Sequence, residues 1–252
     1  MPHPAVDSIP FHPLDSDDRE DESMYGYVYG ERRPLPQGFE EFFDPRRAAV
    51  VSIDMHRGHL EDSPDCPCPA PRAREIVQPI NRFHAECRVL EVPVVHVETT
   101  LRKGGVDDVK GNVAAWRRVF PLYAGPIPNA DAHAIEGSRW TEFVTDVDRE
   151  RDLLVTTKKR LSAFYPTDLE FLLRNLRKET VVLNGGFTDC CVLNAAFDAS
   201  NRDFRVVVLR DLVRGTNPEM EEAALRIMSL HLGVVTDSSE LLRAWRSQLV
   251  RS

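Results

Sequence analysis

From residue 48 onward the sequence alternates short apolar runs with stretches of helical periodicity. Six runs rich in Val, Leu and Ile begin near residues 48, 92, 153, 180, 204 and 234. Between them, apolar residues recur three and four positions apart, as in the segment from Ile76 to Leu90. Strands without a polar face, separated by helices, are typical of a parallel sheet that is buried on both sides. The sequence therefore predicts an α/β fold: a Rossmann-like three-layer sandwich in which helices cover both faces of a six-stranded, mainly parallel sheet.

Length, charge and cysteine content exclude several classes of protein. The 252 residues suffice for one large domain, or for one domain with an extension. A net charge of −8 argues against a nucleic-acid partner, which needs a basic face. No apolar run approaches the roughly 18 residues of a membrane span, and the first residues lack the pattern of a signal peptide. The five cysteines form no regular framework, which fits a reducing compartment, so we expect a cytoplasmic protein. Because no membrane span is predicted, we expect no membrane partner.

Residues 1–46 differ in composition from the rest and are predicted to be an N-terminal arm, with the folded domain over 47–252. They hold 7 of the 18 prolines and an acidic run from Asp15 to Glu22. A segment of this composition cannot build a core by itself. Three alternating tyrosines would share one face of a short strand, namely Tyr25, Tyr27 and Tyr29. The arm is therefore either a flexible tail or a segment that docks on its own domain or on a neighbouring subunit.

Reactive side chains follow three of the predicted strands, where α/β folds place their sites. Cys191 comes after a Gly-Gly turn, in the first turn of a predicted helix. The partial positive charge and free N–H groups of a helix N-terminus favour a thiolate and can hold an oxyanion. Asp54 and Lys158, each at the end of an apolar strand, would supply a base and a positive charge. Taken singly, each of the three also fits a structural role, as a buried inert cysteine or a solvated charge.

Together these segments resemble the isochorismatase-like cysteine hydrolases over residues 48–240. Members of that superfamily include nicotinamidases, N-carbamoylsarcosine amidases, ureidoacrylate amidohydrolases and biuret hydrolases. The order of the motifs matches, and the motif spacing selects Lys158 over Lys159 and Cys191 over Cys190. The three matching segments are Val50–Met55, Lys158–Phe164 and Gly185–Val192.

The resemblance implies a reaction and the residues that perform it. Asp54, Lys158 and Cys191 would form the catalytic triad, with the backbone N–H groups of Phe187 and Cys191 as the oxyanion hole. A cis peptide bond is expected between Gly186 and Phe187. The expected activity is hydrolysis of a non-peptide C–N bond in a small linear amide, most of all a ureide or carbamoyl compound. The alternatives are a nicotinamidase-like amidase and a catalytically silent binding protein on the same fold. The family also implies a homo-oligomer, either a dimer or a tetramer.

Further residues are expected to contact the substrate, whereas no metal or other cofactor is expected. The predicted contacts are His56, Trp116, Arg117 and Phe164. An arginine in this segment could bind a carboxylate or carbonyl of the substrate. The same residues also fit a solvated basic turn. Asp54, His56 and His59 invite a metal-site interpretation. We prefer catalysis for the aspartate. The segment His96-Val97-Glu98, at the end of the second strand, is a poor match for the Asp-x-His segment that marks metal-binding nicotinamidases.

Overall fold

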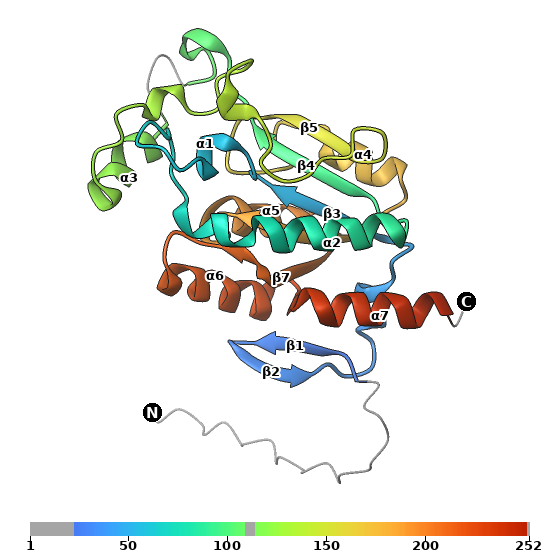
Figure 1. Cartoon of the computed structure of the whole chain (residues 1–252). Coiled ribbons are helices and arrows are strands. Elements are labelled where there is room, and N and C mark those ends of the chain that lie inside the picture. Colours follow the sequence, from blue (N-terminus) through green and yellow to red (C-terminus); the bar gives the residue numbers. More distant parts are fainter. Residues whose placement is uncertain (1–22, 109–113, 251–252) are drawn as a thin grey trace, which may run out of the picture.

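The computed structural model describes residues 23–108 and 114–250, in which one eight-stranded sheet forms the middle layer (Figure 1). The strand order is β2-β1-β8-β7-β6-β3-β4-β5. Six of these strands are mutually parallel, as the apolar runs predict, and the α/β class is confirmed. They are β3 (Ala48–Ile53), β4 (Val94–Thr99), β5 (Leu153–Lys158), β6 (Thr180–Gly186), β7 (Arg205–Arg214) and β8 (Val234–Thr236).

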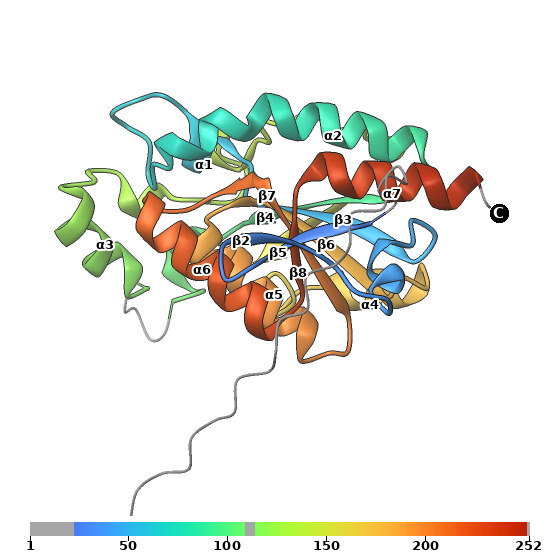
Figure 2. The ribbon, with the colours of Figure 1, turned by 90° about the horizontal axis from the view of Figure 1, so that it is seen from below.

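Helices cover both faces of the sheet (Figure 2). One face carries α2 (Val77–Val89) and α7 (Ser238–Val250), and the other carries α4 (Leu169–Asn175), α5 (Leu193–Ser200) and α6 (Pro218–His231). Alternate residues of β3 serve the two layers: Val51 packs toward α4, α5 and α6, whereas Val50 packs toward α2 and α7. Both side chains are fully buried, which explains why the strand reads as a continuous apolar run.

The prediction of six strands is two short, because a hairpin from the arm extends the sheet. β1 (Tyr25–Val28) and β2 (Glu31–Pro34) are antiparallel, and β1 pairs with β8. The hydroxyl of Tyr27 donates to Asp237 at 2.8 Å, so this part of the arm docks on its own domain. Tyr29 lies in the turn with φ 53°, outside the strand. β2 escapes prediction because it is exposed along its whole length and carries charged residues instead of an apolar pattern.

Residues 1–22, including the acidic run, lie outside the described part of the chain. The division at residue 46 and the oligomeric state stay predictions. Within the described residues, none of the helices has the length and apolar character required to cross a membrane.

The strand order places a switch point between β3 and β6. From β3 the chain proceeds outward through β4 and β5, then returns to add β6, β7 and β8 on the other side of β3. At such a point the carboxyl ends of neighbouring strands diverge and leave room for a ligand. The segments that surround this end are short: α1 (Arg57–Leu60), α3 (Trp116–Ala124), the 3₁₀ turns η2 (Pro71–Ile76), η3 (Lys103–Gly105), η4 (Ala130–Ala132) and η5 (Arg139–Thr141), and the π-helical turn η6 (Thr188–Val192). The 3₁₀ turn η1 (Glu40–Phe43) lies at the opposite end of the sheet, where the carbonyl of Glu41 accepts from the hydroxyl of Thr180 at the start of β6.

Candidate active site

Three side chains from separate strand ends meet at the switch point. Asp54 follows β3, Lys158 ends β5, and Cys191 lies in η6 just after β6. The Nζ atom of Lys158 lies 2.7 Å from Oδ2 of Asp54 and 3.4 Å from Sγ of Cys191. The structure thus brings together the three residues proposed from the motifs, and we call them the candidate triad.

The backbone and one threonine fix the carboxylate of Asp54. The residue has φ 54°, a left-handed conformation that Asp tolerates better than most residues. Its N–H donates to the carbonyl of Val97 at 2.8 Å, and its Oδ1 accepts from the N–H and the hydroxyl of Thr99 at 2.9 and 3.0 Å. Thr99 also accepts from Lys158 Nζ at 2.6 Å. The sequence reasoning missed Thr99, although its place at the end of a strand beside the site was a usable signal.

Burial and opposite charge act against each other within the triad. Burial alone would raise the pKa of Asp54, but the Lys158 ammonium more than offsets this and holds the pKa below its ordinary value. Burial alone would lower the pKa of Lys158, and the carboxylate of Asp54 raises it instead. The adjacent thiol of Cys190, together with burial, raises the pKa of Cys191. The resting site therefore holds an ion pair beside a protonated thiol.

The turn that carries Cys191 depends on a glycine. Gly185 has φ 109°, and a Cβ atom there would lie 2.2 Å from the carbonyl oxygen of Ile53 on β3. The peptide bond between Gly186 and Phe187 is cis, and η6 begins directly after it. π-helical turns of this kind are frequent at functional sites.

A cavity of about 500 Å³ opens beside the triad and has the size of small-molecule sites. Trp116 and Phe120 supply part of its apolar wall. Arg117 also lines it, with a side chain that is only 6 % exposed. The guanidinium pairs with Asp108 at 3.1 Å, while its buried Nε has no partner among the described residues. Two of the four predicted substrate contacts, Trp116 and Arg117, therefore face the cavity.

The other two predicted contacts, Phe164 and His56, do not line this cavity. Phe164 packs in the core against Phe204, with ring centroids 5.9 Å apart. Its ring turns inward because the loop before it is held by Ser162, which accepts from the N–H of Phe164 at 3.0 Å. His56 is completely buried and lies beside Asp54, with Nε2 3.9 Å from Oδ1. A role in substrate contact is thus not supported for Phe164.

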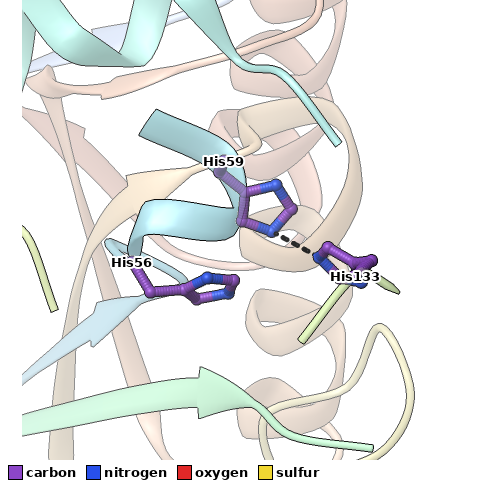
Figure 3. A group of neighbouring side chains, drawn as sticks. All are labelled: His56, His59 and His133. Carbon is purple, nitrogen blue, oxygen red and sulfur yellow. Dashed lines mark hydrogen bonds between the residues drawn. The ribbon is translucent and has the colours of Figure 1, made fainter. Parts of the chain in front are cut away.

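Three buried histidines lie next to the triad: His56, His59 and His133, which we call the histidine trio. Their rings point toward one another, and His59 and His133 also line the cavity (Figure 3). One potential ligand atom from each ring lies within 4.8 Å of the others. Burial lowers the pKa of His56 to about 3 and lowers that of His59 and of His133, so the rings are neutral. Sequence reasoning did not include His133, because it lies in an irregular segment 74 residues from His59.

Comparison with known proteins agrees with the motifs. The model of the isochorismatase domain matches residues 48–240, and this chain belongs to that family, which confirms the resemblance. Maleamate amidohydrolase of Pseudomonas putida is 28 % identical over 201 residues, covering 80 % of this chain and 88 % of that protein. N-carbamoylsarcosine amidase of an Arthrobacter species is 25 % identical over 167 residues, covering 66 % of this chain and 59 % of that one.

Among solved structures, an isochorismatase-like hydrolase from Alkaliphilus metalliredigens superposes with a TM-score of 0.66 at 27 % identity. The match covers 79 % of this chain and 99 % of the other. The three-layer arrangement is thus shared with a hydrolase of the same family.

Proposed function

We propose that this protein is a cysteine-dependent amidohydrolase that cleaves the C–N bond of a small linear amide and releases ammonia. The observation that carries the proposal is the position of Lys158, whose ammonium contacts both the carboxylate of Asp54 and the thiol of Cys191. A purely structural ion pair has no need of a thiol at its open side. The names of the two relatives, a maleamate amidohydrolase and an N-carbamoylsarcosine amidase, support the same reaction class.

The first half of the reaction forms a covalent intermediate. The carboxylate of Asp54 takes the proton from Cys191, and the thiolate attacks the carbonyl carbon of the amide. This transfer moves the negative charge from carboxylate to sulfur while both stay beside the same ammonium, so Lys158 keeps an anionic partner throughout. The backbone N–H groups of Phe187 and Cys191 are proposed to hold the resulting oxyanion. The C–N bond then breaks, and the leaving nitrogen takes the proton from Asp54 and departs as ammonia.

The second half returns the enzyme to its resting state. Asp54, again a carboxylate, takes a proton from a water molecule that attacks the thioester-like carbonyl. The C–S bond breaks, the acid is released, and the proton held by Asp54 returns to the sulfur of Cys191. No external oxidant, reductant or group donor enters this scheme.

The substrate class is proposed from the cavity and from the chemistry of the relatives. Maleamate and N-carbamoylsarcosine both pair a terminal amide with a carboxylate, and both are small enough for a cavity of about 500 Å³. Arg117 lines this cavity, and its guanidinium has the charge and the planar shape that suit a carboxylate or a ureide carbonyl. We favour a ureide or carbamoyl compound that bears a carboxylate.

Ammonia release from a matched panel tests this function. The panel contains N-carbamoyl amino acids, monoamides of dicarboxylic acids and nicotinamide, and Cys191→Ala is the control. We expect the highest kcat/KM with an N-carbamoyl acid and no release by the variant. Nicotinamide as the best substrate would overturn the substrate class, and release by Cys191→Ala would overturn the mechanism.

A further inference from the structure

The histidine trio has the geometry of a ligand set rather than that of ordinary core histidines. His56 directly precedes α1, His59 lies within it, and His133 directly follows η4 (Figure 3). Their exposed fractions are 0 %, 5 % and 5 %. Three buried imidazoles that converge need partners for their nitrogen atoms, because an unpaired buried polar atom is costly.

Hydrogen bonds to the backbone define which nitrogens are available in two of the rings. Nδ1 of His56 lies 2.8 Å from the carbonyl oxygen of Trp140, and Nδ1 of His59 lies 2.8 Å from that of Cys68. A carbonyl accepts only from a protonated nitrogen, so in both neutral rings Nδ1 carries the hydrogen and Nε2 is a bare lone pair. A carbonyl that holds the far N–H is how proteins orient a histidine that binds a metal.

The bare nitrogens have no adequate partner in the described part of the chain. Nε2 of His56 makes no hydrogen bond, and its nearest carboxylate oxygen, Oδ1 of Asp54 at 3.9 Å, is itself an acceptor. Nε2 of His59 lies 3.3 Å from Nε2 of His133, whose Nδ1 is also unpartnered. Two nitrogens bound to one tetrahedral zinc at about 2.0–2.1 Å would be about 3.4 Å apart. The observed separation thus suits two ligands of one ion as well as it suits a hydrogen bond.

Asp54 does not belong to this ligand set. Its two carboxylate oxygens are already occupied by Lys158 and by the N–H and hydroxyl of Thr99. This removes the combination of Asp54, His56 and His59 that the sequence suggested, and it replaces the aspartate with His133. Unlike the Asp-x-His pattern of metal-binding nicotinamidases, the resulting set contains no carboxylate.

We propose that His56, His59 and His133 bind a divalent transition-metal ion, most favourably Zn²⁺, next to the candidate triad. Three imidazole nitrogens suit zinc rather than Mg²⁺ or Ca²⁺, which prefer oxygen ligands. Three protein ligands leave a fourth position, and since His59 and His133 line the cavity, that position faces the substrate space. A water molecule or an oxygen of the substrate would occupy it. This proposal revises the expectation that the protein holds no metal.

Cobalt titration tests the site without any assay of activity. Full-length protein is freed of metal by a chelator, dialysed and titrated with Co²⁺, whose four-coordinate complexes absorb strongly in the visible range. Zinc affinity is measured by competition with a chromophoric chelator. We expect one cobalt per chain. His133→Ala should weaken binding by at least about 100-fold, because loss of a group that merely orients a ligand already costs roughly 10–100-fold.

Three control variants make the result specific. His231→Ala removes an exposed histidine far from the trio and should leave the affinity unchanged. Cys191→Ser should also leave it unchanged, which separates the histidine site from a thiol site. His133→Gln, which keeps a polar side chain of similar size, replaces His133→Ala if the smaller side chain prevents folding.

Several outcomes would overturn the proposal. Folded wild-type protein that shows no cobalt bands at stoichiometric metal would mean that the trio is a hydrogen-bonded cluster only. Binding that survives both His133 substitutions, or that disappears in Cys191→Ser, would place the metal elsewhere. Because these readouts do not depend on amide hydrolysis, the metal site can fail while the proposed function stands, and the reverse also holds.

Discussion

The candidate triad and two rings of the histidine trio, those of His59 and His133, line the same cavity, but triad and trio satisfy their polar atoms in opposite ways. In the triad, Lys158 contacts Asp54, Thr99 and Cys191, and both oxygens of Asp54 are hydrogen-bonded. In the trio, the rings are neutral, and neither Nε2 of His56 nor Nδ1 of His133 has a hydrogen-bond partner within residues 23–108 and 114–250. Buried charges must be paired, whereas a neutral ring can keep a lone pair at lower cost. The triad is therefore complete with groups of this chain, while the trio keeps lone pairs that the proposed cation would bind.

Replacing the thiol tests the triad with the largest expected effect. Cys191→Ala should lower kcat by roughly 10³–10⁶-fold, as removal of a nucleophile does in other hydrolases that use a triad. Cys190→Ala is the matched control, because Cys190 lines the same cavity one position earlier. Its kcat should stay within a few-fold of wild type. Equal losses in the two variants would contradict the assignment of the nucleophile.

Breaking the ion pair tests whether the triad is also a structural unit. Lys158→Met leaves the carboxylate of Asp54 buried without its counter-charge, which should destabilise the protein by about 3–5 kcal/mol. Adding Asp54→Asn should restore much of this stability but no activity. Urea unfolding measures the first effect, and kcat measures the second. If the double variant loses as much free energy of unfolding as the two single variants lose together, the pair does not act as a unit.

Glu98 offers an intermediate case, a buried carboxyl on β4 with one oxygen that has no partner within the described residues. Burial raises its pKa to about 7. The folded state then keeps a proton that the unfolded state loses above about pH 4.5, so this group destabilises the fold as pH rises from about 4.5 to 7. Glu98→Gln should therefore stabilise the protein by about 1–2 kcal/mol at pH 8, after allowance for partial exposure, with little change at pH 4. Thermal unfolding at both pH values measures this, and an equal difference at both would refute the explanation.

Removal of bound metal separates the role of the trio from that of the triad. If the triad is complete by itself, dialysis against a chelator should leave kcat within a few-fold of its starting value. If the trio binds an ion that contacts the substrate, KM should rise by about tenfold, equivalent to about 1.4 kcal/mol of binding. Steady-state kinetics before and after zinc is restored separate the two parameters. A collapse of kcat that zinc reverses would mean that the chemistry itself depends on the ion.

Segments with a regular apolar pattern could be predicted from the sequence, whereas segments without one could not. The apolar run of β3 predicts that the strand ends before Asp54, and the glycines before Cys191 predict the turn after β6. Because a parallel sheet brings the carboxyl ends of its strands together, these reactive residues are also predicted to meet. His133 could not be predicted as a partner of His59, since the segment between β4 and β5 has no periodicity from which to fold it. The inward turn of Phe164 depends on hydrogen bonds of Ser162 that no local pattern reveals. The first strand of the hairpin could be expected from Tyr25 and Tyr27, whereas its partner β2 has no apolar pattern in the sequence.

A covalent intermediate on Cys191 would be detected in the mass of the enzyme during turnover. The protein is mixed with an excess of an N-carbamoyl acid or a dicarboxylic monoamide, quenched in acid within the first turnovers, and examined by intact mass and peptide mapping. The mechanism predicts an added mass equal to the substrate minus ammonia, located on Cys191. An adduct on Cys190 would contradict the mechanism. So would a variant without Asp54 that turns over rapidly while its Cys191 stays unmodified.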